Sequence, residues 1–116
     1  MAKKQPALNI CRFKVKPGKQ AEMEALLARH WPTLRKAGLV TDKKARIYRG
    51  LPSAKAGGRH GAEHVYVEMF EWRDASAIDL AHQLPAVMAV WEPMGAICEE
   101  MEFPEFEAMD LPPPKE

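Results

Sequence analysis

Long hydrophobic runs are absent from this 116-residue sequence, and cysteine is scarce. No apolar stretch approaches the ~18 residues that a membrane-spanning helix needs, so the sequence predicts no membrane partner. The first residues lack the apolar stretch of a secretory signal peptide. The two cysteines, Cys11 and Cys98, form neither a disulfide framework nor a zinc-binding spacing. We therefore expect a small cytoplasmic protein in a reducing environment.

The composition and length are typical of one globular domain. Hydrophobic residues make up 47% of the chain and charged residues 28%, which is unlike a disordered protein. A chain of this length usually forms a single domain with one modest core. We predict one domain over residues 1–116, with a core over about 7–106. Residues 107–116 form a tail, because Pro112, Pro113 and Pro114 prevent regular structure there.

The net charge of +1 conceals a strong asymmetry between the two halves of the chain. Residues 1–60 carry fifteen Lys and Arg against three Asp and Glu, whereas residues 61–116 carry two against thirteen. The basic residues are dispersed and accompany no nucleic-acid-binding motif, so we predict no nucleic-acid partner. We expect the halves to neutralise each other within the fold or across a dimer. In particular, Arg12 and Lys14 are expected beside Glu100 and Glu102.

Hydrophobic spacing predicts the element order β-α-β-β-α-β. The expected strands cover residues 7–15, 44–49, 64–72 and 97–106. Apolar residues at helical spacing predict a helix from Met23 to Leu34, which Pro32 should kink or restart near His30. Gly38 should end this helical region. Further helical segments follow at residues 75–83, after Asp74 as N-cap, and from Pro85 to Gly95, and a loop is expected at 51–62.

This order predicts an α+β ferredoxin-like fold, in which helices cover one face of a four-stranded antiparallel sheet. The third strand is apolar on both faces: Val65, Val67 and Met69 lie on one, and Phe70 and Trp72 on the other. An antiparallel sheet with one solvated face should instead alternate apolar and polar residues. The uncovered face therefore needs a partner, and a second copy of the chain is the simplest one. We predict a homodimer.

Several segments resemble antibiotic biosynthesis monooxygenase-type domains. The segments are Lys14–Lys19 with Glu22–Leu27, and Glu71–Asp74 with Ala77, His82 and Pro85. The resemblance extends from about residue 8 to residue 106 and implies a dimeric α+β barrel. Oxygenases of this family typically use no metal or organic cofactor. They hold an electron-rich phenolic substrate between sheet and helices, where O₂ reacts with its anion. The resemblance thus implies a small aromatic molecule as partner.

The haem-degrading branch of the family has a triad of asparagine, tryptophan and histidine. This chain contains Asn9, Trp72 and His82, but alignment on the Pro17–Gly18 turn and on Trp72 places the triad elsewhere. The asparagine of the triad then falls at Cys11, its tryptophan near Ala81 and its histidine at Trp91. The sequence therefore disfavours haem degradation. Many family members also carry Glu two residues before the strand-end tryptophan, where this chain has phenylalanine.

Three polar residues are candidates for catalysis. Asn9 shares a strand face with apolar residues, where its amide can stabilise an oxyanion or simply bond to backbone or water. His82 can accept a phenol proton, or it can satisfy the end of its helix. Glu68, on an aromatic strand face, is a candidate base or acceptor and needs a partner if it is buried. Its expected partners are Arg46, Arg49, His64 or water.

Aromatic and methionine side chains on the predicted strands and helices fit a pocket for a flat ligand, although such residues also form cores. The substrate-binding candidates are Tyr66, Phe70, Trp72, His30, Trp31, Trp91 and Met88. His60 and His64 with Glu63 suggest a metal, but they lie in a glycine-rich loop without a third ligand, so we predict none.

Two functions remain open from the sequence. The first is a small-molecule monooxygenase for a phenolic, quinol or polyketide-like compound, working without metal or organic cofactor. The second is a non-catalytic dimeric ligand-binding or accessory protein of the same fold, because one fold serves many functions. Polar groups that converge on an apolar cavity would favour the enzyme.

Overall fold

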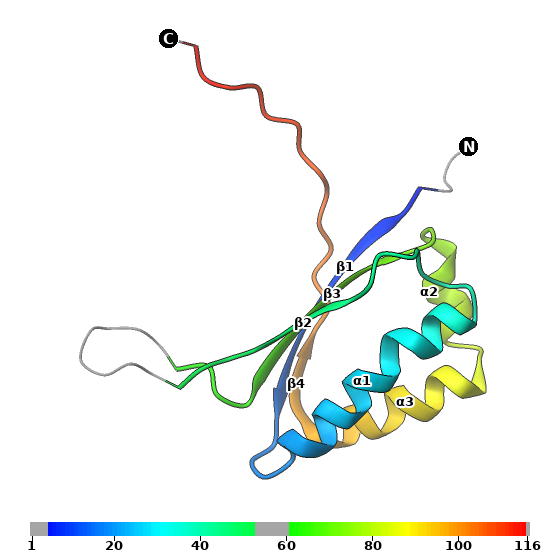
Figure 1. Cartoon of the computed structure of the whole chain (residues 1–116), viewed down its shortest axis with the longest axis vertical. Helices are drawn as coiled ribbons and strands as arrows, with labels where there is room; N and C mark the ends of the chain where they lie inside the picture. Colours follow the sequence, from blue (N-terminus) through cyan, green and yellow to red (C-terminus); the bar gives the residue numbers. More distant parts are fainter. Residues whose placement is uncertain (1–4, 53–60, 116) are drawn as a thin grey trace.

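The computed structural model describes residues 5–52 and 61–115. Its elements are β1 (Ala7–Val15), α1 (Gln20–Lys36), β2 (Arg46–Arg49), β3 (Val65–Trp72), α2 (Ser76–Ala81), α3 (Pro85–Ile97) and β4 (Cys98–Glu102). The strands form one antiparallel sheet in the order β2-β3-β1-β4. All three helices lie on one face of the sheet (Figure 1). The predicted α+β ferredoxin-like class is confirmed.

The helices run further than their prolines and glycines suggested. The predicted restart near His30 is wrong, because α1 continues unbroken through Pro32. A proline removes one helical hydrogen bond, but the buried face of α1, including Met23, Leu27 and Leu34, packs on the sheet on both sides of it. Gly95 does not end α3, which continues to Ile97. Gly38 does follow the end of α1, with a φ of 76° that favours glycine.

Three strands are shorter than their sequences predicted, and β2 begins at Arg46 instead of residue 44. β4 ends at Glu102 instead of Phe106, and Pro104 just beyond it has no N–H for a strand ladder. Residues 103–115 leave the sheet as an irregular segment that projects away from the body (Figure 1). β3 begins at Val65, because His64 has a φ of 70° that strand geometry does not allow. The predicted loop at 51–62 lies largely outside the described residues.

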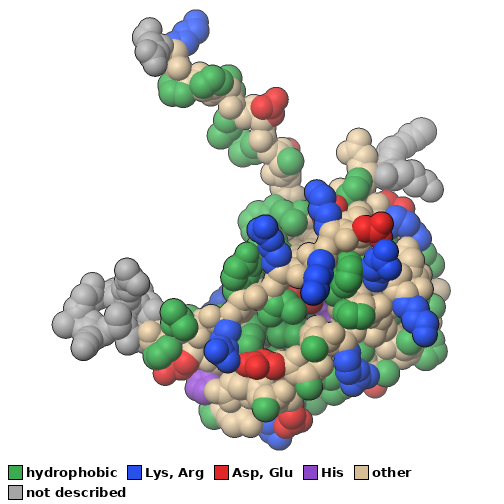
Figure 2. Space-filling view, in the orientation of Figure 1, with side chains coloured by type: hydrophobic (Ala, Val, Ile, Leu, Met, Phe, Trp, Pro, Cys, Tyr) green, Lys and Arg blue, Asp and Glu red, His purple; other side chains and the backbone are tan. Residues whose placement is uncertain are grey.

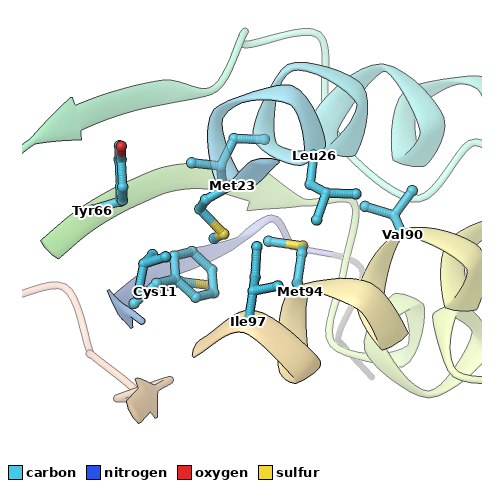
Figure 3. Packing of buried hydrophobic residues seen from close by; sticks show 10 residues of the cluster. Cys11, Met23, Leu26, Tyr66, Val90, Met94 and Ile97 are labelled. Carbon is cyan, nitrogen blue, oxygen red and sulfur yellow. The ribbon is translucent and has the colours of Figure 1, made fainter. Parts of the chain in front are cut away.

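The core lies between the sheet and the helices. Side chains alternate along β1 and β3, so that Cys11, Phe13, Tyr66 and Phe70 are buried beneath the helices. Figure 3 shows one part of this core, where residues of α1 and α3 meet those of β1 and β3. The labelled residues there are Cys11, Met23, Leu26, Tyr66, Val90, Met94 and Ile97. This burial confirms the predicted inner faces of both strands.

The opposite face of the sheet carries apolar side chains that no helix covers. Leu8 is 48% exposed, and its neighbours on this face are half-buried. These neighbours are Ile10, Val65, Val67 and Met69. Hydrophobic side chains also gather along the C-terminal segment and at its base (Figure 2). An exposed apolar surface of this kind marks a site of interaction.

The first and last strands bring opposite charges together, as predicted for Arg12. Its guanidinium lies 3.5 Å from a Glu100 oxygen and 3.6 Å from a Glu102 oxygen. Lys14 lies opposite Glu100 in the strand register, as predicted, but its ion pair is with Glu99 at 3.8 Å. The register between β1 and β4 shifts next to Lys14, which brings Glu99 within its reach. Within the described residues, no helix is long and apolar enough to cross a membrane.

Candidate active site

A cavity of about 970 Å³ opens between the inner face of the sheet, the helices and the segment after β4. Its walls are mainly aromatic. They include Phe13 of β1, Phe70 and Trp72 of β3, Trp91 of α3 and Phe103 after β4. The rings of Phe70 and Trp72 meet edge to face at 5.2 Å, and those of Trp72 and Trp91 at 6.5 Å. A cavity with such walls accepts a flat apolar ligand.

Asn9 lines this cavity, and its neighbours decide how its amide is oriented. Trp72 Nε1 donates a hydrogen bond to Asn9 Oδ1 at 3.0 Å, and Asn9 Nδ2 donates to Cys11 Sγ at 3.0 Å. An indole N–H can only donate, so the amide oxygen must face Trp72. The amide nitrogen has two hydrogens, and only one has a partner among the described residues. Asn9 therefore offers a free donor.

Cys11 lines the same cavity but has no character of a nucleophile. Burial raises the pKa of its thiol to about 12. Reactivity depends on the thiolate, which is negligible at neutral pH for such a group. Cys11 therefore acts as a small apolar wall and as a weak acceptor for the amide of Asn9.

Glu68 is fully buried behind the cavity wall, and its partner differs from every one predicted. His30 Nδ1 lies 2.9 Å and 3.1 Å from its two carboxylate oxygens. Trp91 Nε1 in turn donates to His30 Nε2 at 2.7 Å. Since the indole only donates, Nε2 must carry a lone pair and Nδ1 the hydrogen. His30 is therefore a neutral histidine that donates to Glu68.

His82 lies at the end of α2 and also lines the cavity. Its Nδ1 is 2.9 Å from the carbonyl oxygen of Ile78, and its ring meets that of Trp91 at 4.9 Å. A carbonyl can only accept, so Nδ1 carries a hydrogen, and in the neutral imidazole Nε2 then has the lone pair. No described residue bonds to Nε2. His82 satisfies the end of its helix, as one alternative expected, and keeps a free acceptor as well.

Three of the predicted substrate-binding residues lie outside the cavity lining. Tyr66 is buried at the other end of β3, where its hydroxyl donates to Glu24 at 2.6 Å. Burial and this bond raise the pKa of Tyr66 to about 12. Trp31 packs in the core with the guanidinium of Arg35 5.9 Å from its ring. Met88 is half-buried on α3.

The cavity also has walls that the sequence reasoning did not select. Phe13 and Cys11 share the strand face of Asn9, and this period-two spacing was the signal that could have found them. Met94 lies one turn after Trp91 on α3. Phe103 and the residues up to 108 line the cavity although they belong to no regular element. The sequence placed residues up to 106 in a strand beside the first strand, but it gave no sign that they line a cavity.

No protein-family model and no curated protein sequence matches the chain. Solved structures do. SnoaB, described as a cofactor-independent oxygenase from Streptomyces nogalater, is 20% identical, and the match covers 94% of this chain and 98% of SnoaB with a TM-score of 0.66. A putative antibiotic biosynthesis monooxygenase from Bordetella bronchiseptica is 18% identical over 90% of this chain and 97% of its own, with a TM-score of 0.66. The chain folds as an antibiotic biosynthesis monooxygenase-like domain.

PA3566 from Pseudomonas aeruginosa has the same fold at 14% identity, with coverage of 94% and 100% and a TM-score of 0.68. This chain therefore shares its fold with these three proteins across nearly its whole length. In the described part of the domain, no three histidine, cysteine or acidic residues gather as metal ligands. His60, one of the candidates weighed for a metal, lies outside the described residues.

Proposed function

We propose that this protein is a small-molecule monooxygenase that acts on a phenolic, quinol or polyketide-like compound without a metal or organic cofactor. The observation that carries the proposal is that two residues with an unused polar atom line the same cavity, which also has aromatic walls. The unused atoms are His82 Nε2, which has a lone pair, and Asn9 Nδ2, which has a second hydrogen. One can accept a proton and the other can stabilise the anion that results.

The reaction follows from these two groups. His82 takes the phenol proton, and Asn9 donates to the oxyanion. The electron-rich anion gives electrons to O₂, and a carbon–oxygen bond forms to yield a peroxide. Loss of water from the peroxide breaks the O–O bond and leaves a carbonyl group. For an anthrone, whose reacting carbon is a methylene, His82 returns its proton to the peroxide, one oxygen atom of O₂ enters the product and the other leaves as water. The methylene becomes a carbonyl, and the substrate supplies all four electrons.

Glu68 acts in this proposal through His30, because it is fully buried and does not line the cavity. His30 lines the cavity, but its Nε2 already accepts the hydrogen bond of Trp91. It can take no substrate proton while that bond holds. The buried chain of hydrogen bonds from Glu68 through His30 to Trp91 therefore fixes the ring of Trp91, which is one wall of the cavity. Glu68 is a positioning residue.

Oxygen uptake tests the proposed function directly. The purified protein is incubated with anthrones, quinols and catechols, with a chelator present, and oxygen consumption is followed. We expect uptake with at least one class and, with ¹⁸O₂, one labelled oxygen atom in the product. Binding of these compounds without any oxygen uptake would contradict the proposal. It would favour a ligand-binding or accessory protein, to which the exposed position of His82 also points.

Homodimer formation belongs to the same proposal. The apolar outer face of the sheet, with Leu8 and Val67, has no cover within the described chain. A second copy would bury it and complete a dimeric α+β barrel. The cytoplasmic location expected from the sequence stays a prediction.

A further inference from the structure

The charged side chains that line the cavity are all acidic. They are Glu71 of β3 and Glu105 and Glu107 after β4; no lysine or arginine is among the lining residues of the described chain. Glu71 is neutralised by Lys43, whose Nζ lies 3.3 Å from it. Glu105 and Glu107 are exposed and form no ion pair with any described residue. Two uncompensated negative charges therefore border the cavity.

The polar groups inside the cavity do not offset this charge. His30 is neutral, because its Nε2 accepts the indole hydrogen of Trp91. The Glu68 carboxylate behind it is therefore paired with a neutral histidine and not with a cation. Neutral His82 presents a lone pair, which is also an acceptor. The free donors that we identify are uncharged amides, those of Asn9 and of the exposed Gln5.

The aromatic walls of the cavity also disfavour an anionic ligand. Both indole N–H groups point away from any ligand, since Trp72 donates to Asn9 and Trp91 donates to His30. The two indoles can therefore offer a ligand only ring faces and carbon edges. The face of an aromatic ring carries partial negative charge, which attracts cations and disfavours anions.

We infer that this cavity selects an uncharged flat aromatic compound that carries a hydroxyl donor, and that it rejects analogues carrying a carboxylate or sulfate. The inference rests on the proposed function for the site and narrows its substrate class. A hydroxyl can donate to His82 Nε2 and receive the free hydrogen of Asn9. Among the described lining residues, a carboxylate would meet uncharged amide donors, two acidic neighbours and no lysine or arginine.

The preference is measurable with two compounds that differ by one carboxylate. Danthron is an uncharged dihydroxyanthraquinone, and rhein is the same ring system with a carboxylate added. Both are already quinones, so their binding does not depend on any oxygenase activity. Quenching of the fluorescence of Trp72 and Trp91 reports occupancy, because both rings line the cavity. At neutral pH and low salt we expect danthron to bind roughly tenfold more tightly than rhein.

Charge variants identify the residues responsible. The double variant Glu105→Gln/Glu107→Gln removes the two uncompensated charges and should narrow the difference between the two compounds by a factor of about three. The matched control Glu92→Gln/Asp110→Asn removes two exposed charges that do not line the cavity, and it should leave the difference unchanged. Added salt should also narrow the difference in affinity between danthron and rhein.

Three outcomes would overturn the inference. Rhein could bind as tightly as danthron or more tightly, or danthron could fail to bind. The third is that Glu105→Gln/Glu107→Gln changes the difference in affinity between the two compounds no more than the control variant does. A preference for danthron in a protein that consumes no oxygen with any substrate would leave the inference standing. That result would remove only the proposed oxygenase function.

Discussion

Trp72 holds the side chain of Asn9 by a hydrogen bond of 3.0 Å between residues that lie 63 positions apart in the sequence. The indole can only donate, so it fixes the amide oxygen toward itself and leaves the amide nitrogen for Cys11 and the cavity. Trp72 is thus both a wall of the cavity and the residue that orients the candidate oxyanion donor.

This orientation predicts a coupling between the two residues. Asn9→Ala should lower turnover by about 10²–10³, because one oxyanion donor is lost. Trp72→Phe keeps an aromatic wall but removes the N–H that holds the amide of Asn9. Because this amide can then flip, kcat should fall, and KM should change less than kcat. The kcat values of the wild type, both single variants and the double variant form a double-mutant cycle. Adding Trp72→Phe to Asn9→Ala should change kcat little, and independent effects would contradict the assignment.

His82→Ala should lower turnover at neutral pH by a factor of about 10²–10⁴, with the fold and ligand binding retained. The loss should be smaller for substrates whose phenol is already ionised, since those need no base. Steady-state rates across phenols of different acidity measure this. The control His64→Asn changes a histidine that does not line the cavity and keeps a residue that tolerates positive φ. Full activity of His82→Ala on a weakly acidic phenol would refute the role.

Glu68 and His30 should stabilise the fold as a unit. Glu68→Leu leaves the Nδ1 hydrogen of His30 buried without an acceptor, which costs about 1–3 kcal/mol. His30→Leu leaves the carboxylate buried without its donor and should cost about 3–5 kcal/mol. In urea unfolding, the double variant should lose less stability than the two single losses added together. Simple additivity would show that the two side chains do not depend on each other.

Alkaline pH should destabilise the protein through its buried thiol and phenol. Burial raises the pKa of both Cys11 and Tyr66 from their ordinary values to about 12. Their neutral forms are thus favoured in the folded state, and this contribution is complete below the unfolded pKa values. It is lost as pH rises from about 9 toward 12. Unfolding free energies measured across this range should fall.

The variant Cys11→Ala tests the contribution of the thiol. Its stability should fall less steeply between pH 9 and 10, where the thiols of Cys11 and Cys98 ionise in the unfolded chain and the variant keeps only Cys98. An unchanged slope in this variant would exclude Cys11 as a source of the pH dependence.

Light scattering should report a homodimer, twice the chain mass of 13.1 kDa. The double variant Leu8→Glu/Val67→Glu places two charges on the uncovered sheet face and should shift the protein toward monomer. The control Leu111→Glu adds a charge to the exposed C-terminal segment, away from that face. A wild-type protein that stays monomeric at micromolar concentration would contradict the dimer.

Periodicity predicted the strands well, because side-chain direction in a strand depends only on position along it. The alternation that buries Phe13, Tyr66 and Phe70 could therefore be predicted from neighbouring residues. The pairing of His30 with Glu68 could not, because it depends on how a helix is rotated and translated against the sheet. The same holds for the segment after β4, whose approach to the cavity follows from tertiary packing.

Local signals also gave wrong boundaries where packing outweighed them. Pro32 and Gly95 are both unfavourable inside helices, yet each helix continues because residues on either side bury apolar surface. Propensity differences of one to a few kcal/mol are smaller than the gain from burying several large side chains.

The outer strand β2 leaves one edge of the sheet open. All four of its residues are exposed, and an arginine stands at each end, Arg46 and Arg49. Open strand edges can recruit further chains without limit and so initiate aggregation, and charged side chains at the edge oppose this. Association through the apolar face, by contrast, is complete when two copies have met. The positive charge of Arg46 and Arg49 therefore opposes edge-to-edge growth on a sheet whose outer face is apolar.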